Sequence, residues 1–294
     1  QIHQVVETVP ANSQRDLDIN HYVRLACPAG EDNSSKPGCV DHRGDSFVDL
    51  DASGTIDTYG LVRLEFEVIE DVELIGRLSH YRPDGDTGNF SFAFSRELRN
   101  SVTGETYVIA NTLDPQNSGF MVPNWAEIIN LDAPQSYLYE LFDESGNLVL
   151  SQTIPPLASG RTELNPREEF DIQGGHELAA KGNYLAKITP QGDGAYLFSM
   201  ARYSSNTANA DMSAGYNFAF AVDSSLGESG TQHLFLSNKE TAVWVEENFL
   251  ELANTSDELV NTSITFRGDS GIIAQKDYQI PAKGVVRTGD DIST

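Results

Sequence analysis

An internal repeat constrains the fold of this chain more than any other feature of its sequence. Residues 120–130, FMVPNWAEIIN, align without gaps on residues 244–254, WVEENFLELAN, and the two segments share six positions that are aromatic, Asn, Glu or aliphatic. The similarity continues from 142–164 to 266–289 with one inserted residue. Self-similarity at a fixed spacing means that one structural unit, here of about 125 residues, is built twice.

A further, partial copy lies at the N-terminus. Pro10, Pro156 and Pro281 fall in register, and an arginine follows each of them closely. The chain therefore holds three copies of this proline-marked segment and two of the rest, so one strand is surplus. A surplus strand is typical of a cut through a longer array, or of an edge that pairs with another molecule by strand addition. We favour pairing with another molecule.

Alternation of apolar and polar residues predicts the secondary structure. Val62, Leu64, Phe66 and Val68 fall on one face of an extended segment, with charged residues between them. The same period of two recurs in segments separated by turn residues: 89–97, 106–112, 136–143, 183–190, 195–203, 216–223, 233–238 and 261–268. Many short strands without a long helical pattern predict an all-β fold. With the repeat, this becomes two tandem antiparallel β-sandwich domains, residues 1–155 and 156–294.

The two cysteines, Cys27 and Cys39, lie in a Gly-, Pro- and Ser-rich insertion that only the first copy has. A disulfide between them would close a short loop, stabilise it by roughly 3 kcal/mol in the chain-entropy model and require an oxidising compartment. His21 and His42 flank the pair, so a zinc site is the alternative, although only Cys39 and His42 have chelating spacing. We therefore expect a disulfide and an extracellular or cell-surface location.

The charge balance excludes several classes of partner. The chain has 19 basic and 44 acidic residues, a formal net charge of −25. Such a surface repels nucleic-acid phosphates and anionic lipid headgroups. In addition, no apolar run approaches the roughly 20 residues that a membrane-spanning helix needs. We expect neither nucleic-acid binding nor a membrane span.

A protease-like string, GDSG, ends in Ser270 and Gly271, but the repeat argues against catalysis. Ser270 corresponds to Ser145 in the first copy, and both serines lie between two strands, where Asp, Ser and Gly favour a hairpin turn. A serine nucleophile also needs a base held by an acid. None of the six histidines occupies the same place in both copies. We expect no enzymatic activity.

Recognition tripeptides offer a second functional interpretation. Arg-Gly-Asp occurs twice, as Arg43, Gly44 and Asp45 and as Arg267, Gly268 and Asp269. Both copies fall in segments that we expect to be exposed loops, which a cell-adhesion motif requires. Exposure is equally a property of any polar turn, so the tripeptides are candidate adhesion loops and no more.

Two further patterns concern metals and glycans. Asp49, Asp51, Ser53 and Asp57 follow the opening of an EF-hand-like loop, but the twelfth position, Gly60, is not the acid that calcium needs there. An Asp- and Gly-rich connection between strands without a cofactor is the preferred interpretation, with calcium as the alternative. Four Asn-x-Ser/Thr sequons are candidate glycosylation sites: Asn33, Asn89, Asn254 and Asn261.

Several short motifs recur at matching places in the two copies. They are an Asn that ends an early strand, an Asp-x-x-Gly or Asp-x-Gly hairpin and a proline that marks the next strand: Asn130 and Asn254, Asp143 to Gly146 and Asp269 to Gly271, and Pro156 and Pro281. A late Gly-x-Tyr, Gly182 with Tyr184, occurs in the second copy, whereas the first copy departs from it and reads YGLV. In this order they resemble the immunoglobulin-like modules of prokaryotic surface proteins, including the cell-adhesion-related bacterial type. The resemblance implies a β-sandwich at a cell surface and carries no catalytic residues.

Together these observations predict a structural subunit of an extracellular surface assembly, a filament, stalk or coat. Its partners would be copies of itself or neighbouring surface-protein modules, joined by pairing of terminal strands. The alternative is a secreted adhesin or carbohydrate-binding module that recognises a glycan or receptor through its loops.

Overall fold

The computed structural model describes the larger part of the chain from residue 76 onward. The described residues are 76–83, 90–98, 100–112, 124–157, 182–205, 216–234, 249–268 and 270–288, with the isolated positions Val6, Val9, Pro10, Gln14 and Asp16. The chain divides into two compact units, Gln1–Phe66 and Glu67–Thr294. Within the first unit, Gln14 Nε2 donates a hydrogen bond of 2.8 Å to Asp16 Oδ1. Every described strand belongs to the second unit.

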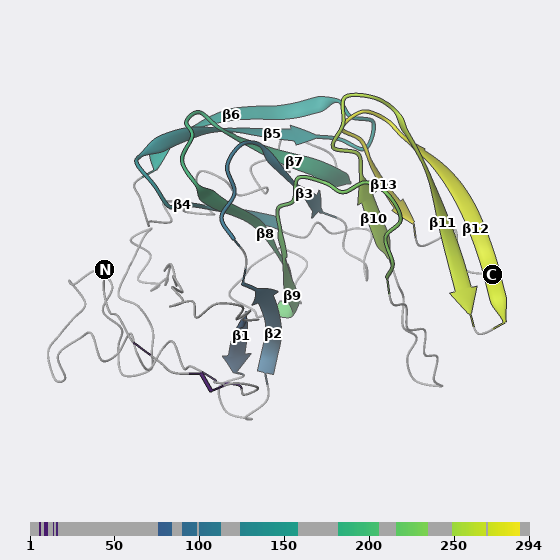
Figure 1. Ribbon diagram of the computed structural model, residues 1–294, viewed down its shortest axis with the longest axis horizontal. Coiled ribbons are helices and arrows are strands. Elements are labelled where there is room, and N and C mark those ends of the chain that lie inside the picture. Colours follow the sequence, from purple (N-terminus) through teal and green to yellow (C-terminus); the bar gives the residue numbers. More distant parts are fainter. Residues whose placement is uncertain are drawn as a thin grey trace, which may run out of the picture. The chain divides into compact units, whose positions relative to one another are not determined.

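The described part of the second unit is all-β (Figure 1). Its strands are β1 (Arg77–Pro83), β2 (Phe90–Glu97), β3 (Thr106–Asn111), β4 (Asn124–Asn130), β5 (Gln135–Phe142), β6 (Leu148–Leu157), β7 (Asn183–Pro190), β8 (Tyr196–Ser205), β9 (Tyr216–Asp223), β10 (Leu250–Ala253), β11 (Val260–Gly268), β12 (Gly271–Ile280) and β13 (Val285–Thr288). No helix occurs among these residues, so none of them forms a helix able to cross a membrane.

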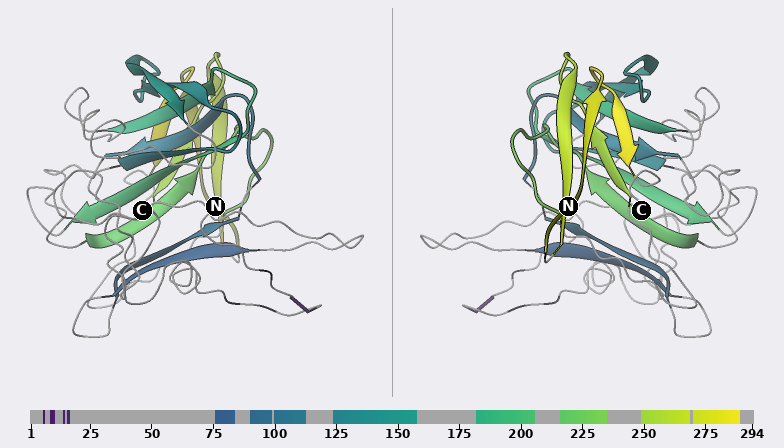
Figure 2. Two further views of the ribbon diagram at one scale, coloured as in Figure 1. Left: turned by 90° about the vertical axis from the view of Figure 1, so that its left-hand side faces the viewer. Right: turned by 90° about the vertical axis from the view of Figure 1, so that its right-hand side faces the viewer.

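Strands β3 to β9 form two antiparallel sheets, which we call the two-sheet body. One sheet has the order β3-β7-β5-β6 and the other the order β4-β8-β9. The sheets lie as separate layers (Figure 2), and the hairpin β1–β2 approaches the second sheet where β2 contacts β9.

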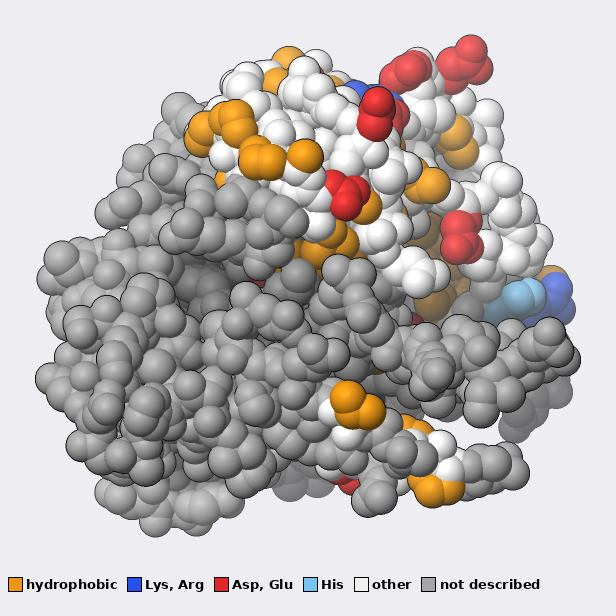
Figure 3. All heavy atoms as spheres, turned by 60° about the vertical axis from the view of Figure 1, so that its left-hand side comes forward, with side chains coloured by type: hydrophobic (Ala, Val, Ile, Leu, Met, Phe, Trp, Pro, Cys, Tyr) orange, Lys and Arg blue, Asp and Glu red, His pale blue; other side chains and the backbone are white. Residues whose placement is uncertain are grey.

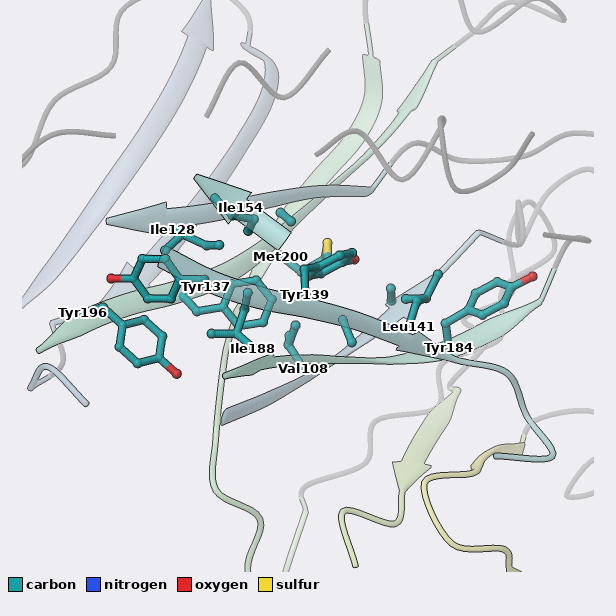
Figure 4. Packing of buried hydrophobic residues seen from close by; sticks show 14 of the residues in the cluster. Val108, Ile128, Tyr137, Tyr139, Leu141, Ile154, Tyr184, Ile188, Tyr196 and Met200 are labelled. Carbon is teal, nitrogen blue, oxygen red and sulfur yellow. The ribbon is translucent and has the colours of Figure 1, made fainter. Parts of the chain in front are cut away.

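The core of the two-sheet body follows from alternation along its strands. In β5, buried and half-buried residues alternate without exception, and Tyr137, Tyr139 and Leu141 point inward. The opposite sheet supplies Tyr196, whose ring meets that of Tyr137 edge-on at a centroid distance of 5.2 Å (Figure 4). It also supplies Phe198, whose ring meets that of Tyr139 edge-on at 6.5 Å. Such aromatic pairs stabilise the core beyond the apolar area that they bury.

Most segments with a period of two are strands in the structure. The segments 89–97, 106–112, 136–143, 183–190, 195–203, 216–223 and 261–268 coincide with β2, β3, β5, β7, β8, β9 and β11 to within two residues at either end. The predicted strand at 62–68 lies outside the described residues, as does most of 233–238. The all-β, antiparallel prediction is therefore confirmed for the part of the chain that the structure describes.

The strands on either side of residue 156 share the same sheets. The predicted boundary between residues 155 and 156 falls inside β6, and β7 inserts between β3 and β5. A tandem repeat fixes the length of the repeated unit but not the residue at which each domain begins. A domain boundary between β9 and β10 would leave both sheets of the two-sheet body whole. The assignment of two tandem sandwich domains stays a prediction.

The last four strands, β10 to β13, are the C-terminal strand group. Here β10 pairs with β13, and β11 pairs with β12 in a long hairpin that stands out in Figure 1. A small second cluster joins this group to the two-sheet body, with Val285 against Tyr107 and Leu185. The C-terminal strand group is therefore attached to the two-sheet body through buried side chains.

Candidate functional site

Most of the predicted site residues lie outside the described residues. These are the cysteines, the first recognition tripeptide, the candidate calcium ligands, two sequons and one aspartate of the second tripeptide: Cys27, Cys39, Arg43, Gly44, Asp45, Asp49, Asp51, Ser53, Asp57, Asn33, Asn89 and Asp269. The disulfide, calcium and adhesion predictions at these positions stay predictions.

The second tripeptide begins at the end of β11. Arg267 and Gly268 are exposed, and Ser270 is an exposed turn residue before Gly271, whose φ is 119°. Ser145 occupies the corresponding turn between β5 and β6. Both serines lie on hairpin turns, as the repeat indicates.

The two repeat-matched asparagines form equivalent buried corners. Asn130 Nδ2 donates to the carbonyl oxygens of Asp132, Ala133 and Leu157, and the last of these lies at the end of β6. Asn254 Nδ2 donates to the carbonyl oxygens of Glu258, Ile280 and Pro281. We call each arrangement an asparagine corner.

Each asparagine corner links the end of one strand to the end of the next strand but one in the sequence. In the first, β4 is linked to β6, and in the second, β10 is linked to β12. The side-chain oxygens also accept hydrogen bonds, Asn130 Oδ1 from Gln135 and Tyr137, and Asn254 Oδ1 from Ser256. Each carboxamide therefore supplies hydrogen bonds to backbone carbonyl groups at strand ends that lack a partner strand there.

The two sequons in the C-terminal strand group have different surroundings. Asn254 is 5% exposed, and its Nδ2, the atom to which a glycan would be attached, is engaged in the asparagine corner. Asn261 is exposed on β11, where its Oδ1 accepts a hydrogen bond of 3.0 Å from Gln279. Asn254 thus has a structural role, whereas Asn261 presents an accessible amide.

A close contact joins the C-terminal strand group to the two-sheet body, and we call it the joint. The turn after β5 meets the turn at residues 281–284: Val285 N donates to Glu144 O at 3.3 Å. A Cβ atom placed on Gly146 would lie 1.9 Å from Ala282 O. Glu144 also accepts two hydrogen bonds from Asn183 through Oε1, at 3.2 and 2.9 Å. The two turns therefore fit together without space for even one additional methyl group.

Lys283 extends the joint into β3. Its φ of 57° is in the left-handed region, which a non-glycine residue rarely adopts. From there Lys283 Nζ donates 2.9 Å to Tyr107 Oη, lies 4.8 Å from the Tyr107 ring centroid, and also reaches Thr255 O and Asp257, 3.2 Å away. These contacts offset the backbone strain at Lys283.

The same network continues across the sheet of β3. Tyr107 Oη donates 2.6 Å to Glu105 Oε1, and Lys187 Nζ lies 3.0 Å from Glu105 and 3.5 Å from Glu140. The hydrogen bond from Tyr107 holds the pKa of Glu105 below its usual value against the opposing effect of burial, and Lys187 adds to this lowering. Burial and the bond to Glu105 raise the pKa of Tyr107, so its hydroxyl stays protonated and bridges the network.

A pocket of about 230 Å³ is lined by residues of β3, β4, β8, β9 and β10. Its polar lining consists of Asn111, Asn124, Arg202 and Glu251. Asn111 and Asn124 exchange two hydrogen bonds, N to Oδ1 at 3.1 Å and Nδ2 to the carbonyl oxygen at 2.8 Å, and Asn111 Nδ2 donates to Glu251. The hydrogen bond from Asn111 to Glu251 is therefore a further contact between the two-sheet body and β10.

On the part of the surface that Figure 3 colours by side-chain type, acidic side chains appear at several separate places. In keeping with this, the residues that the structure describes include no group of three or more His, Cys, Asp or Glu side chains able to hold a metal ion.

The joint is the feature that sequence reasoning missed. The asparagine corners had a signal, because Asn130 and Asn254 end matching repeat segments. Lys283 and Tyr107 are 176 positions apart and belong to no repeat-matched pair. The sequence signal nearest to the joint is Gly284, which follows Lys283 and indicates a turn, but it does not indicate the left-handed backbone of Lys283.

Comparisons with known proteins give little further information. No family model matches the chain, and no curated protein matches it. Among solved structures, the one described as "Crystal Structure of Thermotoga maritima 1070" aligns with a TM-score of 0.30 at 6% identity, covering 43% of this chain and 97% of that chain. No conclusion on fold or function follows from a likeness at that score.

Proposed function

We propose that this protein is a structural subunit of an extracellular surface assembly, a filament, stalk or coat, built from immunoglobulin-like β-sandwich modules. The two-sheet body would be one such module, and the C-terminal strand group the beginning of the next. Chains would join through pairing of terminal strands.

The joint is the observation that carries this proposal. Binding modules that act independently are commonly connected by exposed, polar linkers, across which relative motion is the default. Here the contact between two successive strand groups contains a glycine turn packed against Ala282, a left-handed lysine and a network of charged hydrogen bonds. A connection of this kind transmits force and keeps modules in register, as an assembly subunit must.

The asparagine corners give independent support. Asn130 and Asn254 perform the same function at the same place in the repeat, which favours a tandem array of one module. The resemblance to bacterial surface modules and the predicted disulfide between Cys27 and Cys39 favour an extracellular location.

The direct test is the state of the purified full chain over a wide range of concentration, by electron microscopy and analytical ultracentrifugation. We expect polymers or ordered sheets that grow with concentration and are lost when residues 1–20 are deleted. A chain that remains monomeric at every concentration and ionic strength would contradict the proposal.

Receptor binding is the second candidate, and the exposure of Arg267 and Gly268 at the end of β11 is the observation that favours it. Cells or glycan arrays exposed to the monomeric chain would show one clear ligand, and Arg267→Ala would abolish that binding. Retained binding in Arg267→Ala would exclude this loop as the site.

A further inference from the structure

Strand β11 is a long edge strand without the usual protection against pairing. Its nine residues, VNTSITFRG, include no proline, no lysine and no acid, in a chain with 44 acidic residues. Among the residues that the structure describes, β11 pairs with β12 alone. Natural edge strands are commonly protected by charges, prolines or bulges. On β11 the one charged residue is Arg267, next to the register shift at the turn end, so the edge from Val260 to Phe266 is unprotected and favours strand addition.

The corresponding strand of the two-sheet body is paired on both sides. β5 lies between β6 and β7 and buries Tyr137, Tyr139 and Leu141. On β11, by contrast, Thr262, Ile264 and Phe266 share one face and are each only half-buried. A two-stranded hairpin is marginally stable in water, and further strands with a common apolar face stabilise it.

We propose that β11 pairs with β11 of a second copy of this chain, antiparallel, to form a four-stranded sheet in the order β12-β11-β11-β12. The inference rests on the proposed function and adds a second contact between chains, one that does not involve residues 1–20. A two-fold axis perpendicular to the sheet would relate the copies, which is the commonest symmetry of protein dimers.

The pairing register follows from the strand's length and alternation. Ile264 is the middle residue of β11, so an axis through Ile264 lets all nine residues overlap. Thr262 then lies opposite the partner's Phe266, and Ser263 opposite the partner's Thr265. Because residues two apart share a face, the half-buried side chains of both copies form one continuous surface.

Charge makes β11 suitable for a contact between two acidic molecules. Each chain carries a net charge of −25, so two copies repel one another at long range. The facing strands themselves bring no carboxylates together, because β11 contains none. Salt screens the long-range repulsion and leaves the strand contact intact, so association should strengthen as ionic strength rises.

Two double variants test the register. Ser263→Lys with Thr265→Lys places like charges opposite each other at two symmetric positions, whereas Ser263→Lys with Thr265→Glu makes the same two pairs attractive. Both positions are exposed, and Ser263 lies across from Asp277 on β12, so a lysine at 263 is compatible with the hairpin. By sedimentation equilibrium, we expect the Lys/Lys variant to dimerise at least about tenfold more weakly than the natural chain. The Lys/Glu variant should dimerise at least as tightly as the natural chain.

The matched control is Gln275→Lys on β12. Gln275 is exposed and lies across from Thr265 within the hairpin, but on the strand away from the proposed contact. Dimerisation of this control should be unchanged, and circular dichroism of all variants should show the same fold. Equal weakening in Lys/Lys and Lys/Glu, or equal weakening by Gln275→Lys, would overturn the proposal.

The outcomes also separate this inference from the proposed function. If assembly survives Lys/Lys unchanged and is lost only when residues 1–20 are deleted, pairing through β11 is wrong and the assembly function stands. If the natural chain does not associate at any concentration or ionic strength, both fail.

Discussion

The hairpins β5–β6 and β11–β12 are built alike and have different surroundings. Both are antiparallel pairs with a register shift next to the turn, between Leu141 and Phe142 in the first and between Phe266 and Arg267 in the second. Leu141 is 1% exposed beneath the second sheet, whereas Phe266 is only half-buried. Strand geometry alone therefore does not produce a core in this protein. The second sheet does.

The largest expected effect on stability comes from truncating the inward side chain next to the register shift, which is Leu141 in β5 and Phe266 in β11. Leu141→Ala should lower the free energy of unfolding by about 4 kcal/mol, because it removes buried methyl groups and leaves a cavity. Phe266→Ala should cost about 1 kcal/mol in the monomer, because solvent already reaches that ring. Urea unfolding of dilute protein measures both, and equal losses would mean that β11–β12 has a closed core.

The asparagine corners should show a smaller difference in the same direction. Asn130→Ala leaves three carbonyl groups and the hydroxyl of Tyr137 without the bonds that Asn130 supplies, so we expect a loss of about 3 kcal/mol in unfolding free energy. Asn254→Ala should cost about 2 kcal/mol, because Asn254 is 5% exposed whereas Asn130 is fully buried.

An isosteric control distinguishes hydrogen bonding from packing at the corners. Asn130→Asp keeps the shape of the side chain but removes the donors to the three carbonyl oxygens. At neutral pH the loss of unfolding free energy in Asn130→Asp should equal or exceed that in Asn130→Ala, because a buried carboxylate would also face three carbonyl oxygens. A variant as stable as the natural chain would show that the donors are dispensable.

The sequence predicted those parts of the fold that depend on local pattern. Alternation located β3, β5, β7 and β9 because side-chain direction along a strand has a period of two. The repeat located the asparagine corners because a buried strand end needs the same carboxamide wherever the unit recurs.

Long-range pairing was not predictable in the same way. Nothing local indicates that β7 inserts between β3 and β5, and the boundary that we drew from the repeat, between residues 155 and 156, falls inside β6. Sequence alignment also matches Phe142 with Phe266, whereas the register shifts match Leu141 with Phe266. One residue of slip exchanges the two faces of a strand, so only the observed pairing identifies the inward residues.

The joint can be tested at a turn glycine that has a matched control. Gly146 and Gly104 have φ values of 81° and 79°, but only Gly146 has Ala282 O within reach of an added Cβ, at 1.9 Å. Gly146→Ala should cost about 2 kcal/mol, and Gly104→Ala about 1 kcal/mol from backbone strain alone. Limited proteolysis should release the C-terminal strand group faster only in Gly146→Ala. Equal sensitivity in the two variants would mean that the joint is loosely packed.

The smallest expected effect is a change in acid stability at the edge of the joint. Tyr107 lowers the pKa of Glu105 from 4.5, so Glu105 contributes stability that is present above pH 4.5 and is lost as the pH falls through the folded-state pKa. In Tyr107→Phe the lowering shrinks, and the stability gap to the natural chain should narrow as the pH drops below 4.5. Because the Glu105 side chain is 48% exposed, the change should stay under about 1 kcal/mol.

Glu105→Gln is the control, because it removes the titrating group, and its unfolding free energy should also fall less steeply than that of the natural chain as the pH drops. Urea unfolding from neutral to acid pH measures the natural chain and both variants. A gap that stays constant with pH would mean that the bond from Tyr107 does not favour the ionised carboxylate, and that the joint is held by Lys283 and packing alone.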